Sequence, residues 1–268
     1  MKKKTVVHFG GGALGRGLVI PLLVDSGYDV VLVDTNTALI EALGRHCSYP
    51  LDLTDAQPDS RLRTIPLKAV INGQDTEKVA EWLHKTDIVT TSVLRNNLVH
   101  IARTISSVWL TNDCTGKMVL CCENVENVGA YFRSLLLDNA EPEAYENLAR
   151  LRVPDVVVDR ICTAHFPDTI QVSSELFYEC AVDAEALADT GIELIKSIAN
   201  ITGAFYKKRF LMNTYADAVS FLALSKGKNY LYEATVDEAI NRDVAAYIAL
   251  LKRLLIVEYG YSAEEVDQ

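Results

Sequence analysis

The stretch from Val6 to Gly17, VVHFGGGALGRG, constrains this chain more than any other. A short apolar run ends at Phe9, glycines follow with the spacing G-x-G-x-x-G, and helical periodicity then begins. In a dinucleotide-binding turn the first glycine makes the turn, the second lets the pyrophosphate approach, and the third lets helix and strand pack. The N-terminus of the helix faces the phosphate charge. The expected cofactor contacts in this stretch are Gly10, Gly12, Ala13, Leu14 and Gly15.

An acidic residue stands where such a fold binds a ribose. A second apolar run, 29–33, ends in Asp34, about twenty residues past the glycines. A carboxylate at this position repels a 2′-phosphate, so Asp34 favours NAD over NADP, and Asn36 completes the expected contacts. An ordinary glycine-rich turn remains an alternative. An S-adenosylmethionine site can use a similar turn and acid, so the fold is better determined than the ligand.

The net charge and the N-terminal residues limit the classes of partner that this chain can have. The 268 residues carry a formal net charge of -10, which argues against nucleic acid, because phosphate backbones are held by clustered Lys and Arg. The basic start MKKKTVV leads into an apolar run that stops at Gly10, too soon for a signal peptide or a membrane span. We therefore expect a cytoplasmic protein whose partner is a small molecule. Its oligomeric state does not follow from the sequence.

The cysteines indicate a reduced protein without a metal centre. Six of them, at 47, 114, 121, 122, 162 and 180, form no C-x-x-C pair, and none has the spacing of a metal site. Buried, reduced thiols are the simplest interpretation, and no metal is expected.

Apolar runs alternate with amphipathic segments through the first half of the chain. Strands are expected at 5–9, 28–33, 87–91 and 118–122, and helices at 14–26, 37–44, 76–85, 96–106, 126–137 and 143–151. The runs 49–53 and 63–71 predict a strand pair inserted after the first βαβ unit, and 169–180 predicts one further strand. Such alternation is typical of an α/β fold with a parallel, doubly wound sheet of the Rossmann type.

The pattern changes near residue 184. From there helix follows helix, with long periodic stretches at 215–224 and 235–258, and no further strand is expected. A capping box from Ser262 to Glu265 begins a last short helix after Gly260. We place the boundary within 182–188, and we expect a Rossmann domain at 1–185 and an all-helical domain at 186–268.

Two polar groups in the expected Rossmann domain are candidates for chemistry. Glu123 and Asn124 follow the strand at 118–122, at the sheet edge where doubly wound folds bind ligands, although asparagine is also common in plain turns. Arg160 follows another apolar run, with Glu175 further along the chain. Its guanidinium suits a phosphate or carboxylate, but a structural pair with a carboxylate is the commoner use of such an arginine.

A third polar group, KKRFLMNT, occupies residues 207–214 in the helical half. A partly desolvated lysine near a positively charged nicotinamide has its neutral form favoured, which suits a general base at neutral pH. Asn213, a little more than one helical turn further on, can donate hydrogen bonds to a developing alkoxide. A solvated basic face is the alternative.

Taken together, these residues resemble the polyol-specific long-chain dehydrogenase family, and most closely its mannitol-1-phosphate 5-dehydrogenase branch. The matching segments run along nearly the whole chain in the same order and spacing. They are HFGGGALGRG at 8–17, VDTN at 33–36, CEN at 122–124, VDRI at 158–161, KRFLMNT at 208–214 and EYGY at 258–261.

The resemblance implies an NAD-dependent enzyme that interconverts mannitol 1-phosphate and fructose 6-phosphate by hydride transfer. It implies a Rossmann domain joined to a helical substrate domain, with no metal. Carried onto this sequence, the family pattern makes Lys208 the base, while Asn213 and Asn124 hold the substrate oxygen. Lys208, Asn213 and Arg160 are then the expected substrate contacts.

The chain departs from the family pattern in two respects. The family has a histidine three residues after the asparagine, where this sequence has Ala216, and no histidine follows His165. Loss of that imidazole predicts a rate lower by orders of magnitude, and rescue by Tyr215 or Asp217 is not expected, because neighbouring side chains of a helix point in different directions. The helical domain is also expected to be shorter than in the family.

Two other functions fit the same residues. A catalytically impaired, NAD-binding paralogue would keep the Rossmann half and bind NADH without turnover. A hexuronate reductase, acting on fructuronate or tagaturonate, is a sister activity in the family. The basic residues of the helical half suit a phosphate or a carboxylate equally well; they are Lys207, Arg209, Lys226 and Lys228.

Overall fold

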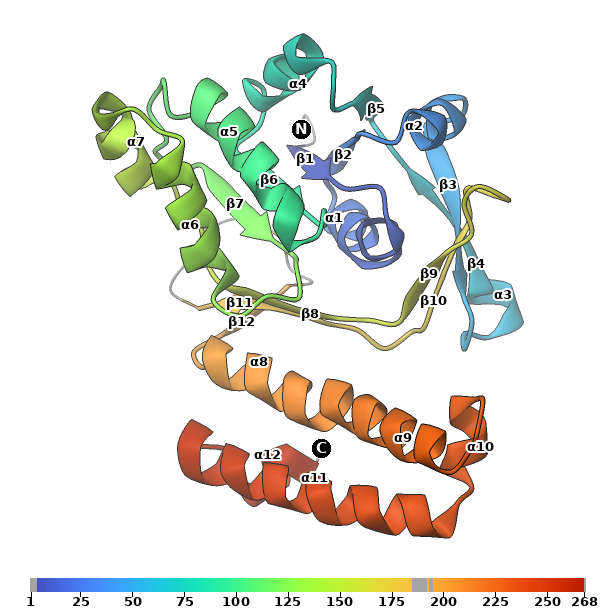
Figure 1. The fold of residues 1–268 in the computed structure, drawn as a ribbon. Helices are drawn as coiled ribbons and strands as arrows, with labels where there is room; N and C mark the ends of the chain where they lie inside the picture. The colour runs from blue at the N-terminus through green and yellow to red at the C-terminus, as the bar shows by residue number, and fades with distance from the viewer. Residues whose placement is uncertain (1–3, 185–191, 193–194, 268) are drawn as a thin grey trace. The chain divides into compact units, whose positions relative to one another are not determined.

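The computed structural model describes residues 4–184, 192 and 195–267 (Figure 1). The chain divides into two compact units, Met1–Ala199 and Asn200–Gln268. The expected domain boundary, between residues 185 and 186, lies outside the described residues. Among the residues that are described, no helix is long and apolar enough to cross a membrane.

A five-stranded parallel sheet forms the centre of the first unit. Its strands lie in the order β5 (Ala69–Asn72), β2 (Asp29–Asp34), β1 (Thr5–Phe9), β6 (Ile88–Thr91) and β7 (Met118–Cys121). Every neighbouring pair is parallel, and the order reverses direction between β1 and β6, as in a doubly wound dinucleotide fold. The expected α/β Rossmann-type sheet is therefore confirmed.

Helices cover both faces of this sheet, and Figure 1 shows α1 and α5 on opposite sides. Asn36 and Asp75 accept backbone N–H bonds at the starts of α2 and α4, so both helices begin at N-caps that the sequence supplies. The helical segments of the unit are η1 (Gly15–Val19), α1 (Ile20–Asp25), α2 (Thr37–Gly44), α4 (Thr76–Leu83), η2 (Arg95–Asn97), α5 (Leu98–Val108), α6 (Val128–Asp138), η3 (Pro142–Ala144) and α7 (Tyr145–Arg150).

A second, four-stranded sheet has the order β4 (Leu62–Pro66), β3 (Ser48–Leu53), β10 (Val172–Ser174) and β9 (Cys162–Ala164), with the short helix α3 (Pro58–Arg61) between β3 and β4. The antiparallel pair of β3 and β4 confirms the inserted strand pair. The single strand expected at 63–71 was wrong, because β4 ends at Pro66 and the chain enters the central sheet as β5. The apolar alternation continues through this break, so the pattern hid it.

A third sheet has the order β12 (Lys196–Ile198), β11 (Glu179–Asp183) and β8 (Val156–Asp159). Two expectations fail here. The strand expected at 169–180 is two strands, β10 and β11, which belong to different sheets. A strand, β12, also follows residue 184, where none was expected. With only three residues, Lys-Ser-Ile, β12 is too short to carry a period that the sequence could reveal.

The second unit is helical. It contains α8 (Ile201–Lys208), η4 (Arg209–Asn213), α9 (Thr214–Ser225), α10 (Leu231–Thr235), α11 (Glu238–Tyr259) and α12 (Ala263–Asp267). The expected apolar stripe of α11 is partly confirmed, since Val244 and Ile240 pack with Val219 of α9 in a small core. Ser262 and Glu265 exchange the two hydrogen bonds of the expected capping box at the start of α12.

Candidate active site

The three glycines of the turn after β1 have three different environments. Gly10 has φ +111°, a conformation that residues with a Cβ rarely adopt, so it makes the turn. A Cβ on Gly12 would meet no atom within 4 Å, so this position is open for close approach of a ligand. A Cβ on Gly15 would collide with the Gly10 carbonyl and with His8, because the helix start lies against the strand. These environments would suit the turn, approach and packing roles of a dinucleotide-binding turn.

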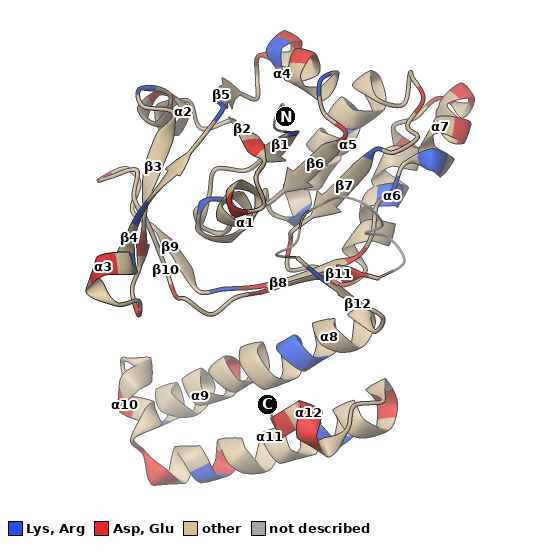
Figure 2. Cartoon of the chain, turned by 180° about the vertical axis from the view of Figure 1, so that it is seen from behind, with Lys and Arg blue, Asp and Glu red and all other residues tan. Residues whose placement is uncertain are grey.

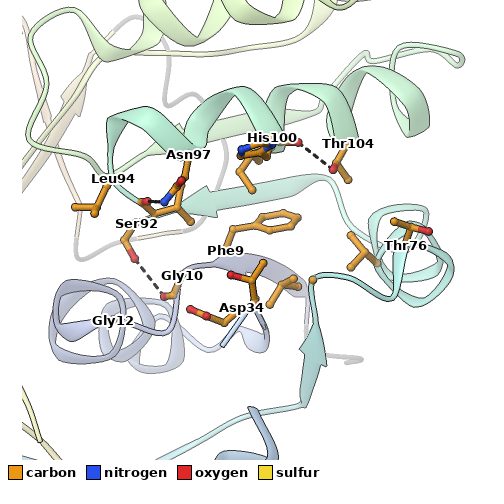
Figure 3. Close-up of a pocket in the computed structure, with 16 residues that line it drawn as sticks. Phe9, Gly10, Gly12, Asp34, Thr76, Ser92, Leu94, Asn97, His100 and Thr104 are labelled. Atoms are coloured by element: carbon orange, nitrogen blue, oxygen red, sulfur yellow. Dashed lines mark hydrogen bonds between the residues drawn. The ribbon is translucent and has the colours of Figure 1, made fainter. Parts of the chain in front are cut away.

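A cavity of about 630 Å³ opens at the carboxyl ends of the central strands (Figure 3). Gly10 and Gly12 line it from the turn, Asp34 lines it from the end of β2, and α4 and α5 contribute Thr76 and His100. It therefore lies where the strand order reverses, which is the ligand position of doubly wound folds.

Asp34 is fixed beside the turn by the backbone. Its Oδ2 accepts the N–H of Gly11 at 2.6 Å, and its Oδ1 accepts the N–H of Asn36 at 2.8 Å. Both carboxylate oxygens therefore accept backbone N–H groups at the end of β2. The Asn36 side chain accepts the N–H of Leu39 at 3.1 Å, so Asn36 is the N-cap of α2. Leu14 packs against the core.

His8 lies behind the turn and was missed in the sequence. Its Nε2 lies 3.0 Å from the Gly10 carbonyl and its Nδ1 lies 2.7 Å from the Thr90 hydroxyl, so Nε2 donates to the carbonyl and Nδ1 accepts from the hydroxyl. Burial lowers the pKa of His8 to about 4, although the bond to Gly10 opposes this shift. The neutral imidazole therefore braces the first glycine. A histidine inside an otherwise apolar strand was the available signal.

Arg16 braces the turn from the other side. Its side chain is buried, Nε donates to the Gly11 carbonyl at 2.6 Å, and a terminal nitrogen donates to the Ile170 carbonyl. The Tyr49 hydroxyl donates to the Arg16 carbonyl at 2.6 Å. Burial lowers the pKa of the guanidinium. Arg16 thus ties the glycine turn to the second sheet, a role that the sequence did not reveal.

Glu123 and Asn124 follow β7 at the carboxyl edge of the sheet, as expected. The Glu123 carboxylate accepts the Thr91 hydroxyl at 2.8 Å and the Val93 N–H at 2.9 Å, and burial raises its pKa. Glu123 therefore connects the ends of β6 and β7, while Asn124 is exposed at the same edge.

Arg160 contacts backbone carbonyls in the structure. Its Nε donates to the Glu175 carbonyl at 2.7 Å and a terminal nitrogen donates to the Gly17 carbonyl at 2.8 Å. The Glu175 carboxylate accepts the N–H of Ile161 at 2.8 Å. Burial lowers the pKa of Arg160. Arg160 therefore has a structural role, but its partners are backbone carbonyls and not the expected carboxylate. Its guanidinium connects the segment after β8 to the helix that follows the glycine turn.

Lys208 and Asn213 stand at the two ends of a π-turn. The helix runs without interruption from α8 through η4 into α9, and the N–H of Thr214 donates to the carbonyl of Arg209, five residues earlier. In such a turn residues five apart are one turn apart, so Lys208 and Asn213 fall on one face of the helix. Ala216, one α-helical turn later, falls on the same face. Lys208 is buried and Asn213 is exposed.

The other basic residues of the second unit mostly have partners within it. Lys226 and Lys228 both approach the Asp237 carboxylate, at 3.2 and 3.4 Å, and these contacts with the N-cap bonds hold the Asp237 pKa at about 2. Lys207 donates to the Glu265 carbonyl. Figure 2 shows the basic residues that end α8. Lys207, Lys226 and Lys228 therefore already contact other groups of the second unit.

Comparison with known proteins assigns the family. A family model described as the mannitol dehydrogenase Rossmann domain matches residues 4–196. The chain belongs to the mannitol dehydrogenase family. The resemblance found in the sequence is thereby confirmed, and so is the Rossmann-type fold.

Two curated relatives share one name. The chain is 30% identical to a mannitol-1-phosphate 5-dehydrogenase of Ajellomyces capsulatus, over 98% of this chain and 69% of that protein. It is 31% identical to a mannitol-1-phosphate 5-dehydrogenase of Shouchella clausii, over 96% of this chain and 70% of that protein.

A solved structure of another dehydrogenase has a similar fold. It is Pseudomonas fluorescens mannitol 2-dehydrogenase, in a ternary complex with NAD and D-mannitol. The TM-score is 0.76 at 17% identity, over 99% of this chain and 68% of that one. At this identity the likeness concerns the fold.

Proposed function

We propose that the protein is an NAD-dependent oxidoreductase that interconverts mannitol 1-phosphate and fructose 6-phosphate. The observation that carries this proposal is the cavity at the carboxyl ends of β1 and β2, which Gly10, Gly12 and Asp34 line in the way that a dinucleotide site would require. Membership of the mannitol dehydrogenase family and the names of the curated relatives support the choice of substrate.

The residues of the cavity fit NAD. Gly12 leaves room for a pyrophosphate, and Arg16 engages the Gly11 carbonyl of the same turn through its Nε. The Asp34 carboxylate would accept ribose hydroxyls and repel a 2′-phosphate, which would select NAD over NADP. NAD, when bound, supplies the hydride acceptor, and the protein must supply the proton acceptor.

Lys208 is our candidate for that proton acceptor. Its amine in the neutral form takes the proton of the substrate hydroxyl as the hydride leaves, and Asn213 and Asn124 donate hydrogen bonds to the oxygen on which charge develops. The π-turn supports this pairing, because it puts Lys208 and Asn213 on one face of one helix. Arg160 is proposed as a substrate contact through the guanidinium N–H groups that do not donate to the carbonyls of Glu175 and Gly17.

A second function has one specific observation in its favour. Ala216 occupies the position on the Lys208 face where the family pattern has a histidine, so a catalytically impaired NAD-binding protein is the alternative. The pairing of Lys226 and Lys228 with the Asp237 carboxylate engages both lysines whichever anion the substrate carries, so the hexuronate reductase stays an alternative. The six free cysteines suit a reducing compartment such as the cytoplasm.

Reduction of NAD by the purified protein tests the substrate. The panel contains mannitol 1-phosphate, mannitol and the hexonate that hexuronate reductases form. The proposal predicts NADH formation with mannitol 1-phosphate at a rate well above the other two. NADH formation only with the hexonate would replace the proposed substrate, and NADH binding without turnover on any of the three would favour the impaired paralogue.

A further inference from the structure

One residue at the cavity has a backbone conformation that its side chain disfavours. Leu94, just after β6, has φ +69° and ψ 149°, at the edge of a region that glycine alone populates freely. Its side chain is 77% exposed, although a leucine gains free energy from burial. Strained conformations of this kind persist only where the surrounding structure holds them, and they cluster at ligand sites.

Hydrogen bonds on both sides of Leu94 hold it in place. The Val93 N–H donates to the Glu123 carboxylate at 2.9 Å, and the Val93 carbonyl accepts the Asn97 side-chain amide at 2.6 Å. The Leu94 carbonyl accepts the Asn97 N–H at 3.0 Å. Glu123 is buried and is itself bound by Thr91. The loop is thus fixed from one side by the buried Glu123 carboxylate and from the other by the exposed Asn97 side chain, and these contacts set the position of the exposed leucine.

Leu94 lines the same cavity as the cofactor residues. Figure 3 places Thr76 and Leu94 at opposite ends, with Asp34 and the glycine turn between them. In a dinucleotide fold the acid binds the adenosine ribose and the turn binds the pyrophosphate. The portion of the ligand that continues past Gly12 toward Leu94 is then the nicotinamide riboside.

We propose that Leu94 is an apolar contact for the nicotinamide riboside half of NAD, and that Glu123 and Asn97 hold its backbone in the strained conformation that this contact requires. The bound cofactor would cover the side chain that the protein leaves exposed. A contact that is fixed in advance loses little freedom on binding, which favours affinity. This inference rests on the proposed cofactor.

Paired titrations with NADH and ADP test the contact, because ADP lacks the nicotinamide riboside. Leu94→Ala is expected to raise the Kd for NADH about 5-fold, from the lost apolar contact, and to leave the Kd for ADP unchanged. Leu62→Ala is the matched control, since Leu62 is 66% exposed on β4 and outside the cavity lining. It should bind both ligands like the wild type.

The outcomes separate the contact from the cofactor. An unchanged Kd for NADH in Leu94→Ala, or equal losses for NADH and ADP, would overturn the role of Leu94 while the cofactor stands. A wild-type protein that binds neither ligand would overturn the cofactor itself. Thermal melting tests the strain separately: Leu94→Gly should melt about 3 °C above Leu94→Ala, because only glycine adopts this backbone freely. Equal melting temperatures would show that the backbone is not strained.

Discussion

The glycine turn and the helix of residues 201–225 carry the two halves of the proposed reaction, and they encode them differently. In the turn, each function belongs to the backbone: Gly10 turns the chain, Gly12 leaves space and Gly15 permits contact with the strand. In the helix, function belongs to side chains, and the register that aligns Lys208 with Asn213 comes from a π-turn. Backbone requirements restrict sequence strongly, whereas a side-chain pair depends on the local helix type.

The difference also concerns what each region retains. Every glycine of the G-x-G-x-x-G spacing has the environment that the dinucleotide role requires, and His8 and Arg16 reinforce the turn through carbonyls of Gly10 and Gly11. The helix retains a lysine and an asparagine but has Ala216 at the third position of the same face. Cofactor binding should therefore be robust in this protein, while turnover should be slow.

The largest effect is expected in the helix. Lys208→Ala should lower turnover about 10³-fold, since it removes the general base, and should leave the Kd for NADH unchanged. Steady-state kinetics and an NADH titration measure the two quantities. Lys207→Ala is the neighbouring control, because that amine donates to the Glu265 carbonyl, and its turnover should stay near wild type. Equal losses in both variants would remove Lys208 from the role of base.

Acid should lower the free energy of unfolding through protonation of His8. Its pKa is about 4 in the folded protein and 6.5 in the unfolded chain, so the unfolded chain binds more protons between these values. The free energy of unfolding should therefore fall as the pH drops from 6.5 to 4, by about 3 kcal/mol in total from this group. Urea unfolding at several pH values measures the slope. His8→Asn should flatten it, and an equal slope in the variant would assign the acid sensitivity to other groups.

Alanine substitutions at Gly15 and Gly12 separate the effect on packing from the effect on cofactor binding. Gly15→Ala should cost about 2 kcal/mol of unfolding free energy, because the new methyl group collides with the Gly10 carbonyl. Gly12→Ala should fold normally, since its Cβ meets no atom within 4 Å, but it should weaken NADH binding. Urea unfolding and fluorescence titration provide both readouts. The turn roles would be wrong if Gly12→Ala bound NADH like the wild type.

A smaller effect than that of Lys208→Ala is expected at the ribose position. Asp34→Ala should raise the Kd for NADH about 10-fold through loss of ribose hydrogen bonds, and should reduce the preference for NADH over NADPH. Asp29→Ala, at the other end of β2, removes a surface pair with Lys68 and serves as the control. If Asp34→Ala kept both the affinity and the preference, the carboxylate would not contact the ribose.

The sequence predicted the central sheet and the turn well, for a physical reason. Buried parallel strands are continuous apolar runs, and the glycine spacing specifies strand, turn and helix together. Prediction failed where the chain changes sheets without changing its pattern, as at Pro66 between β4 and β5. It also failed for β12, whose three residues are too few for any period.

The candidate site was predictable only in part. Asp34 follows from spacing, but the braces His8, Arg16 and Glu123 depend on contacts between segments far apart in the chain, such as the bond from Glu123 to Val93. The assignment of Lys208 and Asn213 came from resemblance, because an α-helical register would not align residues five apart.

The central claim is that the chain binds NAD in the turn and uses the Lys208 helix for a slow hydride transfer. A fluorescence titration of NADH, followed by NADH consumption with fructose 6-phosphate on the same sample, tests it most directly in the wild type and in Ala216→His. The account predicts saturable binding in both proteins, slow oxidation by the wild type, and oxidation at least about 10-fold faster in Ala216→His. Absence of NADH binding, or binding without oxidation in both proteins, would contradict it.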